Sequence, residues 1–183
     1  MVSLPSEEMT RIELRDPTLV VVVGAAGSGK STFAARWFDP SDVLSSDAFR
    51  EILTGDAADQ RATKMAFSII HREVTRRLAA GRTVVVDATN VERHARRQLV
   101  SRARFAGVPA IAIVFALPSD VVHARNAARS ERVVDPEIVA RHITRLEAAL
   151  PVILGEGFAA VSILRSAAEV ETAQVVRQEI SDG

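Results

Sequence analysis

The sequence predicts an α/β fold, in which helices cover both faces of a five-stranded parallel sheet. The first observation is that short runs of apolar, mostly β-branched residues alternate with longer segments whose apolar residues recur at helical spacing. The second is that residues 19–23 are apolar throughout and residues 83–86 are entirely β-branched, as expected for parallel strands that are buried on both faces. With 183 residues, 48% of them hydrophobic, the chain suits a single domain over residues 1–183.

The predicted elements follow one another in a regular order. Residues 1–17 are polar and are predicted as a lead-in to the first strand. Gly81 follows a predicted helix, as glycine commonly does at helix C-termini, and Pro136 begins another. Ser119 is predicted as a helix N-cap. The predicted strands are 18–23, 43–45, 83–86, 110–117 and 161–164, and the predicted helices are 30–38, 48–53, 61–80, 92–106, 119–129, 136–150 and 168–180.

Composition narrows the class of protein. The chain has no cysteine, which excludes a disulfide framework and cysteine–metal sites. Residues 1–17 lack a long apolar run, and the first strand is too short to span a bilayer, so we expect a soluble cytoplasmic protein. Net charge is zero, but residues 61–145 hold 16 Lys and Arg against 7 Asp and Glu. This asymmetry indicates either a negatively charged partner or ordinary solvated helix faces.

The most specific feature is the glycine-rich segment at residues 24–32, which has the spacing G-x-x-x-x-G-K-S of a P-loop, or Walker A motif. Glycines let the backbone approach phosphate closely, and the N–H groups of the loop and the next helix surround an anion. We expect Lys30 to contact the β- and γ-phosphates of a nucleoside triphosphate and Ser31 to ligate magnesium. The predicted nucleotide-binding residues of the loop are Gly24, Ala25, Ala26, Gly27, Ser28, Gly29, Lys30, Ser31 and Thr32.

Two carboxylates follow the second and third predicted strands, at the edge where open α/β sheets bind their ligands. Asp47 is the predicted general base of a phosphoryl transfer, and Arg50, on the same helix face, could hold an anion of the acceptor. The alternative is that Asp47 is only an N-cap paired with Arg50. Asp87 either helps to order Mg²⁺ or fixes the turn that follows its strand, and Asn90 is a turn or cap residue.

Arginines follow in the second half of the chain. Arg125, Arg129 and Arg132 are spaced i, i+4 and i+7, which predicts one basic stripe on a helix. A charged break after this helix makes residues 120–136 a predicted Arg-rich lid that closes over the triphosphate, unless the stripe is simply exposed to solvent. Two further basic clusters could follow a phosphate backbone or could be solvated helix faces. Their members are Arg72, Arg76 and Arg77, and Arg93, Arg96, Arg97, Arg102 and Arg104.

The aromatic and histidine residues are not predicted to take part in the site. Four phenylalanines fall at apolar helix or strand positions and are expected in the core rather than as base-stacking platforms: Phe33, Phe67, Phe105 and Phe115. The four histidines lack the spacing of metal ligands or of a catalytic triad, and we expect surface or capping roles for them. They are His71, His94, His123 and His142.

In combination, four motifs resemble those of polynucleotide 5′-hydroxyl kinases, and most closely the kinase module of bacterial end-healing RNA-repair enzymes. They are G-A-A-G-S-G-K-S-T-F at residues 24–33, S-S-D-x-x-R at 45–50, V-V-D-A-T-N at 85–90 and R-N-x-x-R-x-x-R at 125–132. The resemblance covers about residues 12–165. It implies a P-loop kinase fold that uses ATP with Mg²⁺ and transfers the γ-phosphate to the 5′-OH end of RNA or DNA.

The resemblance also implies roles for single residues. Lys30 and Ser31 match the phosphate and magnesium residues, Asp47 matches the general base, and Arg50 matches the contact to an acceptor phosphate. The lid arginines of the family hold the ATP phosphates or the nucleoside, and the matching residues are Arg125, Arg129 and Arg132.

The chain departs from the full repair enzymes, which carry phosphatase and ligase-like modules after the kinase. We therefore expect it either to heal 5′ ends alone or to work beside separate phosphatase or ligase partners. Two other functions stay open. One is a small-molecule, sugar or toxin-like kinase on the same scaffold, and the other is a nucleotide-binding switch with little transfer activity. A general base at Asp47 disfavours the nucleotide-binding switch, because a switch does not need a base on the acceptor side. A cation at Arg50 favours a phosphorylated acceptor, because a neutral sugar has no anion for it to bind.

Overall fold

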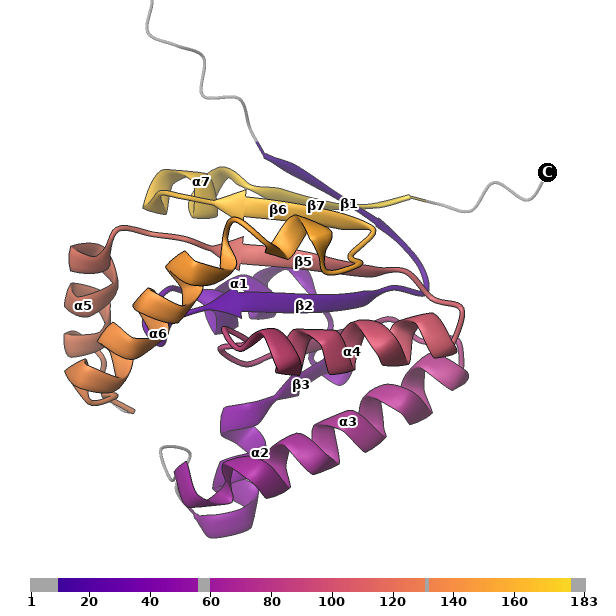
Figure 1. The fold of residues 1–183 in the computed structure, drawn as a ribbon, viewed down its shortest axis with the longest axis horizontal. Helices are drawn as coiled ribbons and strands as arrows, with labels where there is room; N and C mark the ends of the chain where they lie inside the picture. The colour runs from indigo at the N-terminus through magenta and orange to yellow at the C-terminus, as the bar shows by residue number, and fades with distance from the viewer. Residues whose placement is uncertain (1–9, 56–59, 131, 179–183) are drawn as a thin grey trace, which may run out of the picture.

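The fold is a computed structural model, and the structure describes residues 10–55, 60–130 and 132–178. Its centre is a five-stranded parallel sheet with the strand order β3-β4-β2-β5-β6 (Figure 1), which confirms the predicted fold class. The predicted strands lie within a residue or two of the observed ones. These are β2 (Leu19–Gly24), β3 (Val43–Ser45), β4 (Val84–Asp87), β5 (Ala110–Phe115) and β6 (Ala160–Leu164).

Helices cover both faces of this sheet. In the view of Figure 1, α3 and α4 lie in front of the sheet and α1 lies behind it. The longer helices are α1 (Lys30–Trp37), α2 (Ser46–Thr54), α3 (Thr63–Ala79), α4 (Arg93–Phe105), α5 (Ser119–Ala127), α6 (Pro136–Ala149) and α7 (Ala167–Thr172). Single turns of 3-10 helix occur at Pro40–Asp42, Gln60–Ala62 and Ile153–Gly155. No helix in the described ranges has both the length and the apolar character needed to cross a bilayer.

The alternation of side chains along β2 divides the core into two layers. Val21 packs in a cluster with residues of α3 and α4, whereas Val20 and Val22 pack with residues of α1 on the opposite face. All three valines are fully buried. Because a parallel strand between two helical layers must be apolar on both sides, the uninterrupted apolar run in the sequence has a direct physical cause.

The two ends of the chain differ from the prediction. Instead of a polar lead-in and a long closing helix, β1 (Arg11–Arg15) and β7 (Gln174–Gln178) pair in parallel as a separate two-stranded sheet. The predicted helix 168–180 is therefore wrong beyond Thr172, where α7 ends. The outermost parts of both predictions, residues 1–9 and 179–183, lie outside the described residues. In β1, Ile12 and Leu14 are buried, so a short apolar alternation was present in the sequence.

Two local predictions are also corrected. The N-cap position of α5 is Pro118 and no side chain caps this helix, so Ser119 is its first residue rather than its cap. The side chain of Arg96, predicted in a surface cluster, is fully buried.

The Arg96 guanidinium is held on all sides. Its Nε and Nη2 donate to the two carboxylate oxygens of Glu156 at 2.7 and 2.6 Å, and its Nη1 donates to the carbonyl groups of Asn90 and Val91 at 2.9 and 2.8 Å. Glu156 follows the last 3-10 turn, and Asn90 and Val91 belong to the loop after β4. Arg96 therefore joins α4, the loop after β4 and the segment before β6. A buried charge pair of this kind is stable only because both partners are present.

Replacing Glu156 with alanine leaves the Arg96 guanidinium buried without a carboxylate. We expect Glu156→Ala to lower the free energy of unfolding by about 3–5 kcal/mol, measured by urea denaturation. The matched control is Glu147→Ala on the exposed side of α6, where we expect a change within about 0.5 kcal/mol. The double variant Arg96→Met/Glu156→Leu should lose less stability than Glu156→Ala. Equal stability of Glu156→Ala and the control would show that this pair does not hold the fold.

Candidate active site

The P-loop joins β2 to α1, and two of its glycines adopt left-handed backbone conformations. Gly27 has a φ of +87° and Gly29 a φ of +96°. A Cβ added at Gly27 would lie 2.8 Å from the carbonyl oxygen of Val122, so α5 packs directly against the loop backbone. Gly29 is the N-cap of α1. Both positions therefore require glycine, and the loop presents backbone rather than side chains to a ligand.

The Lys30 side chain is buried at the N-terminus of α1. Its ammonium donates to the carbonyl oxygen of Ala25 at 2.7 Å and lies 3.5 Å from the Ser28 hydroxyl. Burial lowers the pKa of Lys30 to about 8, although the carboxylates of Asp87 and Asp47 act in the opposite direction. The phosphates of a nucleotide would supply the negative charge that favours the ammonium form. The loop and Lys30 therefore fit a triphosphate.

Asp87 ends β4 and faces the same region. Burial raises the pKa of its carboxyl group, and the Lys30 ammonium and a hydrogen bond with Ser31 partly offset this. Ser31 and Asp87 thus bring two oxygen ligands together. Within the described ranges, no group of three or more His, Cys, Asp or Glu side chains could hold a metal ion. Since Mg²⁺ commonly binds through one or two protein oxygens, phosphates and water, this pair suits magnesium beside a bound triphosphate.

The turn after β4 is fixed by Asn90 rather than by Asp87. Asn90 has a φ of +47°, and its amide nitrogen donates to the carbonyl oxygens of Val22 at 2.8 Å and Val86 at 3.4 Å. In the same loop the carbonyl oxygen of Thr89 accepts from the N–H of Gly24 at 2.9 Å. These bonds attach the loop to the start of the P-loop. The Asp87 carboxylate is not needed for this turn.

Asp47 lies in the first turn of α2 and forms an ion pair with Arg50 one turn later. The N-cap of this helix is Ser45, whose hydroxyl accepts from the N–H of Ala48 at 3.4 Å. The capping half of the alternative interpretation of Asp47 is therefore wrong, while the predicted ion pair is present. Arg50 is 9% exposed and Asp47 is half-buried, so the pair lies partly sheltered from water.

The three lid arginines do not form one helical stripe. Helix α5 ends at Ala127, so Arg129 lies beyond it, and Arg132 has a φ of +63°. The buried side chain of Asn126 causes this change of direction, because it donates to the carbonyl oxygen of Val134 at 2.7 Å and accepts from its N–H at 3.1 Å. Within the predicted lid, Glu131 is outside the described residues.

The arginines nevertheless gather around the P-loop. A Cβ added at Gly29 would lie 3.6 Å from Nη1 of Arg125. Arg129 and Arg132 line the cavity described next, and Nη2 of Arg132 lies 3.3 Å from a carboxylate oxygen of Glu51 on α2. The sequence spacing thus identified cations that reach the site by a turn rather than by a common helix face.

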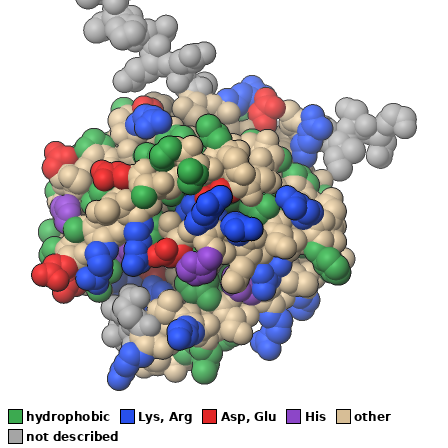
Figure 2. Space-filling model, in the orientation of Figure 1, with side chains coloured by type: hydrophobic (Ala, Val, Ile, Leu, Met, Phe, Trp, Pro, Cys, Tyr) green, Lys and Arg blue, Asp and Glu red, His purple; other side chains and the backbone are tan. Residues whose placement is uncertain are grey.

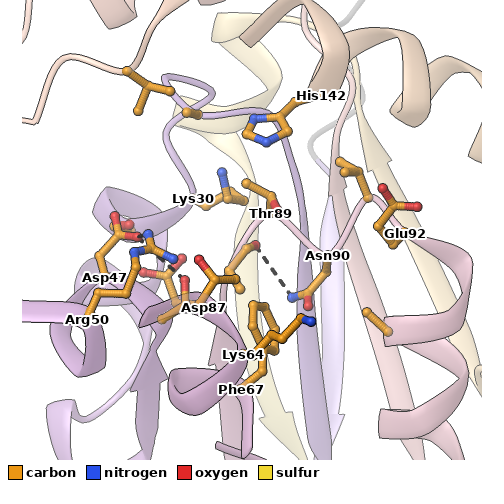
Figure 3. A pocket seen from close by; sticks show the side chains of 18 of the residues that line it. Lys30, Asp47, Arg50, Lys64, Phe67, Asp87, Thr89, Asn90, Glu92 and His142 are labelled. Carbon is orange, nitrogen blue, oxygen red and sulfur yellow. Dashed lines mark hydrogen bonds and ion pairs between the residues drawn. The ribbon is translucent and has the colours of Figure 1, made fainter. Parts of the chain in front are cut away.

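A cavity of about 580 Å³ connects these groups. Figure 3 shows Lys30, Asp87 and the Asp47–Arg50 pair around one part of it, with Lys64 and Phe67 further along and His142 across from them. The cavity continues between α3 and α4. Of the predicted site residues it brings together Ala26, Lys30, Ser31, Asp47, Arg50, Asp87, Arg129 and Arg132, whereas Gly24, Ala25, Gly27, Ser28, Gly29, Thr32 and Arg125 do not line it.

Several residues of this cavity were missed by the sequence analysis. Phe67, predicted in the core, lines the cavity on α3 together with His71, and His94 and His142 line it from α4 and α6. Burial, followed by the charge of Lys30 and nearby arginines, lowers the pKa of His142 to about 4, so this side chain is neutral at pH 7. Phe33 and Phe115 are in the core as predicted, but Phe105 is 90% exposed.

A P-loop between strand and helix, with one carboxylate at the end of β4 and another in the first turn of the helix after β3, defines the chain as a P-loop kinase domain. Residues 19–153 match the AAA_33 family of AAA domains, and the chain belongs to this family. A search of curated protein sequences found no match.

Solved structures with this fold include proteins of different functions. Kti12 from Chaetomium thermophilum, in complex with ADP-AlF3, has a TM-score of 0.63 and 17% identity over 84% of this chain and 93% of that one. A chain of the Pnkp1/Rnl/Hen1 RNA repair complex matches with a TM-score of 0.63 and 23% sequence identity, over 81% of this chain and 48% of that one. A gluconokinase from Sinorhizobium meliloti matches with a TM-score of 0.55 and 19% sequence identity, over 86% of this chain and 87% of that one. At these identities the likeness establishes the fold.

The lowered pKa of Lys30 makes nucleotide binding depend on pH. Above about pH 8 the free protein loses the Lys30 proton, and an ATP phosphate beside the amine favours its return. We therefore expect ATP in excess Mg²⁺ to bind about tenfold more weakly at pH 9 than at pH 7. Calorimetry at pH 8 in buffers of different ionisation enthalpy should show uptake of about half a proton per ATP bound. Lys30→Arg, which stays charged, should show a flat profile; a flat profile for the wild type would contradict this assignment.

Proposed function

We propose that this chain is an ATP-dependent kinase that transfers the γ-phosphate to the 5′-OH end of a polynucleotide, RNA or DNA. The observation that carries the proposal is that the Asp47–Arg50 pair and Lys30 share one cavity, which continues away from the P-loop between α3 and α4. An acceptor in that continuation would have its hydroxyl beside Asp47. Separate phosphatase or ligase proteins would complete the repair of a broken strand.

The roles follow from the positions of the groups. The P-loop N–H groups and Lys30 would hold the ATP phosphates, and Arg125, Arg129 and Arg132 would neutralise charge that develops on the transferred phosphoryl group. Ser31 and Asp87 would hold Mg²⁺, which supplies further positive charge to the phosphates. In the transfer itself, the acceptor hydroxyl gives its proton to Asp47 while its oxygen bonds to the γ-phosphorus and the bond to ADP breaks.

Arg50 supports a phosphorylated acceptor. Its guanidinium lies on the cavity beside the proposed base, where it could hold the phosphate that follows the terminal sugar of a polynucleotide. A neutral sugar would not need such a cation. The likeness to the RNA repair complex supports the same acceptor, and the ADP-AlF3 bound to Kti12 supports an adenine nucleotide as donor.

A second candidate is a kinase of a sugar or another small hydroxyl compound. It is favoured by the likeness to a gluconokinase and by the size of the cavity, which falls within the range typical of small-molecule sites. In this case the same base, P-loop and arginines would serve a different acceptor.

The two candidates are separated by transfer of labelled γ-phosphate from ATP with Mg²⁺. The acceptors are a 5′-OH RNA, a 5′-OH DNA, a 3′-nucleotide, and unphosphorylated sugars and nucleosides. We expect label on the 5′ ends of RNA, DNA or both. Label on a sugar and on none of the nucleic acids would replace this proposal with the second candidate.

The role of Asp47 can be tested separately from ATP binding. Asp47→Asn keeps the size of the side chain but removes the proton acceptor, so we expect kcat to fall by about 10²- to 10⁴-fold. The Kd for ATP should change little. Glu171→Gln, an exposed carboxylate-to-amide change on α7 and outside the cavity, is the control and should keep full activity. An undiminished kcat in Asp47→Asn would rule out Asp47 as the base.

A further inference from the structure

We infer that the part of the cavity between α3 and α4 is a subsite for the terminal nucleobase of the acceptor, with Phe67 as its stacking surface. The inference rests on the proposed function, because it concerns the acceptor whose 5′-OH lies beside Asp47. It specifies that the base is recognised as well as the hydroxyl and the phosphate.

The walls of this subsite come from two helices. Lys64, Phe67 and His71 line it from α3, and His94 and Gln98 line it from α4. The rings of Phe67 and His71 meet edge to face, with centroids 6.1 Å apart and planes at 60°. They form an angled aromatic wall at the side of the cavity, to which a flat base could stack.

Two buried polar atoms of the same region have no hydrogen-bond partner among the described residues. They are Oδ1 of Asn90 and Nε2 of His71. The Asn90 side chain is 2% exposed, and its amide nitrogen is committed to the carbonyl groups of Val22 and Val86, so the orientation of the amide is fixed. Oδ1 is then left as a buried acceptor in a residue that lines the cavity. A buried acceptor without a partner is unfavourable, and a ligand donor would satisfy it.

A nucleobase combines the two features that these walls require. It has a flat π-face for Phe67, and its edge carries hydrogen-bond donors and acceptors for Asn90 and His71. Burial, followed by the charge of Arg102, lowers the pKa of His71, so its ring is neutral at pH 7. A sugar would offer hydroxyl groups but no flat face.

The charges around the subsite suit the chain that would follow the base. Lys64 lies on the cavity, and the Glu92 carboxylate on the same cavity is already paired with Nη1 of Arg145 at 2.5 Å. Figure 2 shows Lys and Arg side chains spread over the face that carries α3 and α4, with histidines between them. On α3 and α4, Arg72 and Arg97 are exposed and have no ion pair within the described part of the chain. The surroundings of the subsite are therefore favourable for phosphates.

The test compares two 5′-OH oligonucleotides that differ only in the terminal base. One is intact, and the other has an abasic terminal nucleotide that keeps its sugar, its 5′-OH and its 3′ phosphate. For the wild type we expect kcat/KM to fall by about 5- to 150-fold on the abasic oligonucleotide, mainly through KM. Phe67→Ala should lose a similar factor on the intact oligonucleotide and little more on the abasic one, because both changes remove the same contact.

Two further variants complete the design. Phe105→Ala removes an aromatic residue that is 90% exposed and outside the cavity, and it should behave like the wild type on both acceptors. Phe67→Leu keeps apolar volume in case the alanine variant does not fold, and it should also narrow the difference between the acceptors.

Equal kcat/KM of the wild type on the intact and abasic oligonucleotides would overturn the inference while leaving the kinase activity in place. Equal losses for Phe67→Ala on both acceptors would overturn it as well. If the wild type phosphorylates neither oligonucleotide, the proposed function fails and the inference fails with it.

Discussion

The site depends on how the loop after β4 is bonded to the P-loop. Asn90 donates to the end of β2, Thr89 accepts from Gly24, and the carbonyl groups of Asn90 and Val91 are held by the Arg96 guanidinium. Glu156 in turn neutralises that guanidinium. The two loops that carry Lys30 and Asp87 therefore form one hydrogen-bonded unit. Because its donors and acceptors are buried, each depends on its partner, and the unit holds Lys30 and Asp87 in a fixed relation to one another.

The buried charges around this unit also depend on their partners. Lys30 is buried close to two carboxylates and near Arg129, so the region contains both signs of charge at low exposure. In such surroundings a charged side chain is favourable only with its counter-charge, and a bound polyphosphate would add several negative charges beside Lys30 and Arg129. The depressed pKa of Lys30 and the raised pKa of Asp87 are two consequences of the same burial.

The sequence was sufficient where local pattern determines structure. The apolar run before Gly24 and the glycine spacing predicted a strand, a loop and a helix. Because open α/β sheets bind ligands beyond the carboxyl ends of their strands, the sequence also predicted that Asp47 and Asp87 lie near Lys30. The sequence was insufficient where the burial of a side chain depends on a residue far away along the chain. Nothing local distinguishes the buried Arg96 from its exposed neighbours, since the carboxylate that neutralises it, Glu156, is 60 residues away. Phe67 is likewise predicted in the core from its position on the apolar face of α3, and only the position of α4 shows that a cavity lies beside it.

The pairing of β1 with β7 has a consequence for how the chain reaches its native state. Arg15 and Gln178, hydrogen-bonded across this small sheet, are 163 residues apart. During synthesis β1 is made well before its partner β7, so the apolar side chains of Ile12 and Leu14 lack the neighbouring strand until β7 has followed. Closure of so long a loop is entropically unfavourable, which makes the joining of the two ends a late step of folding.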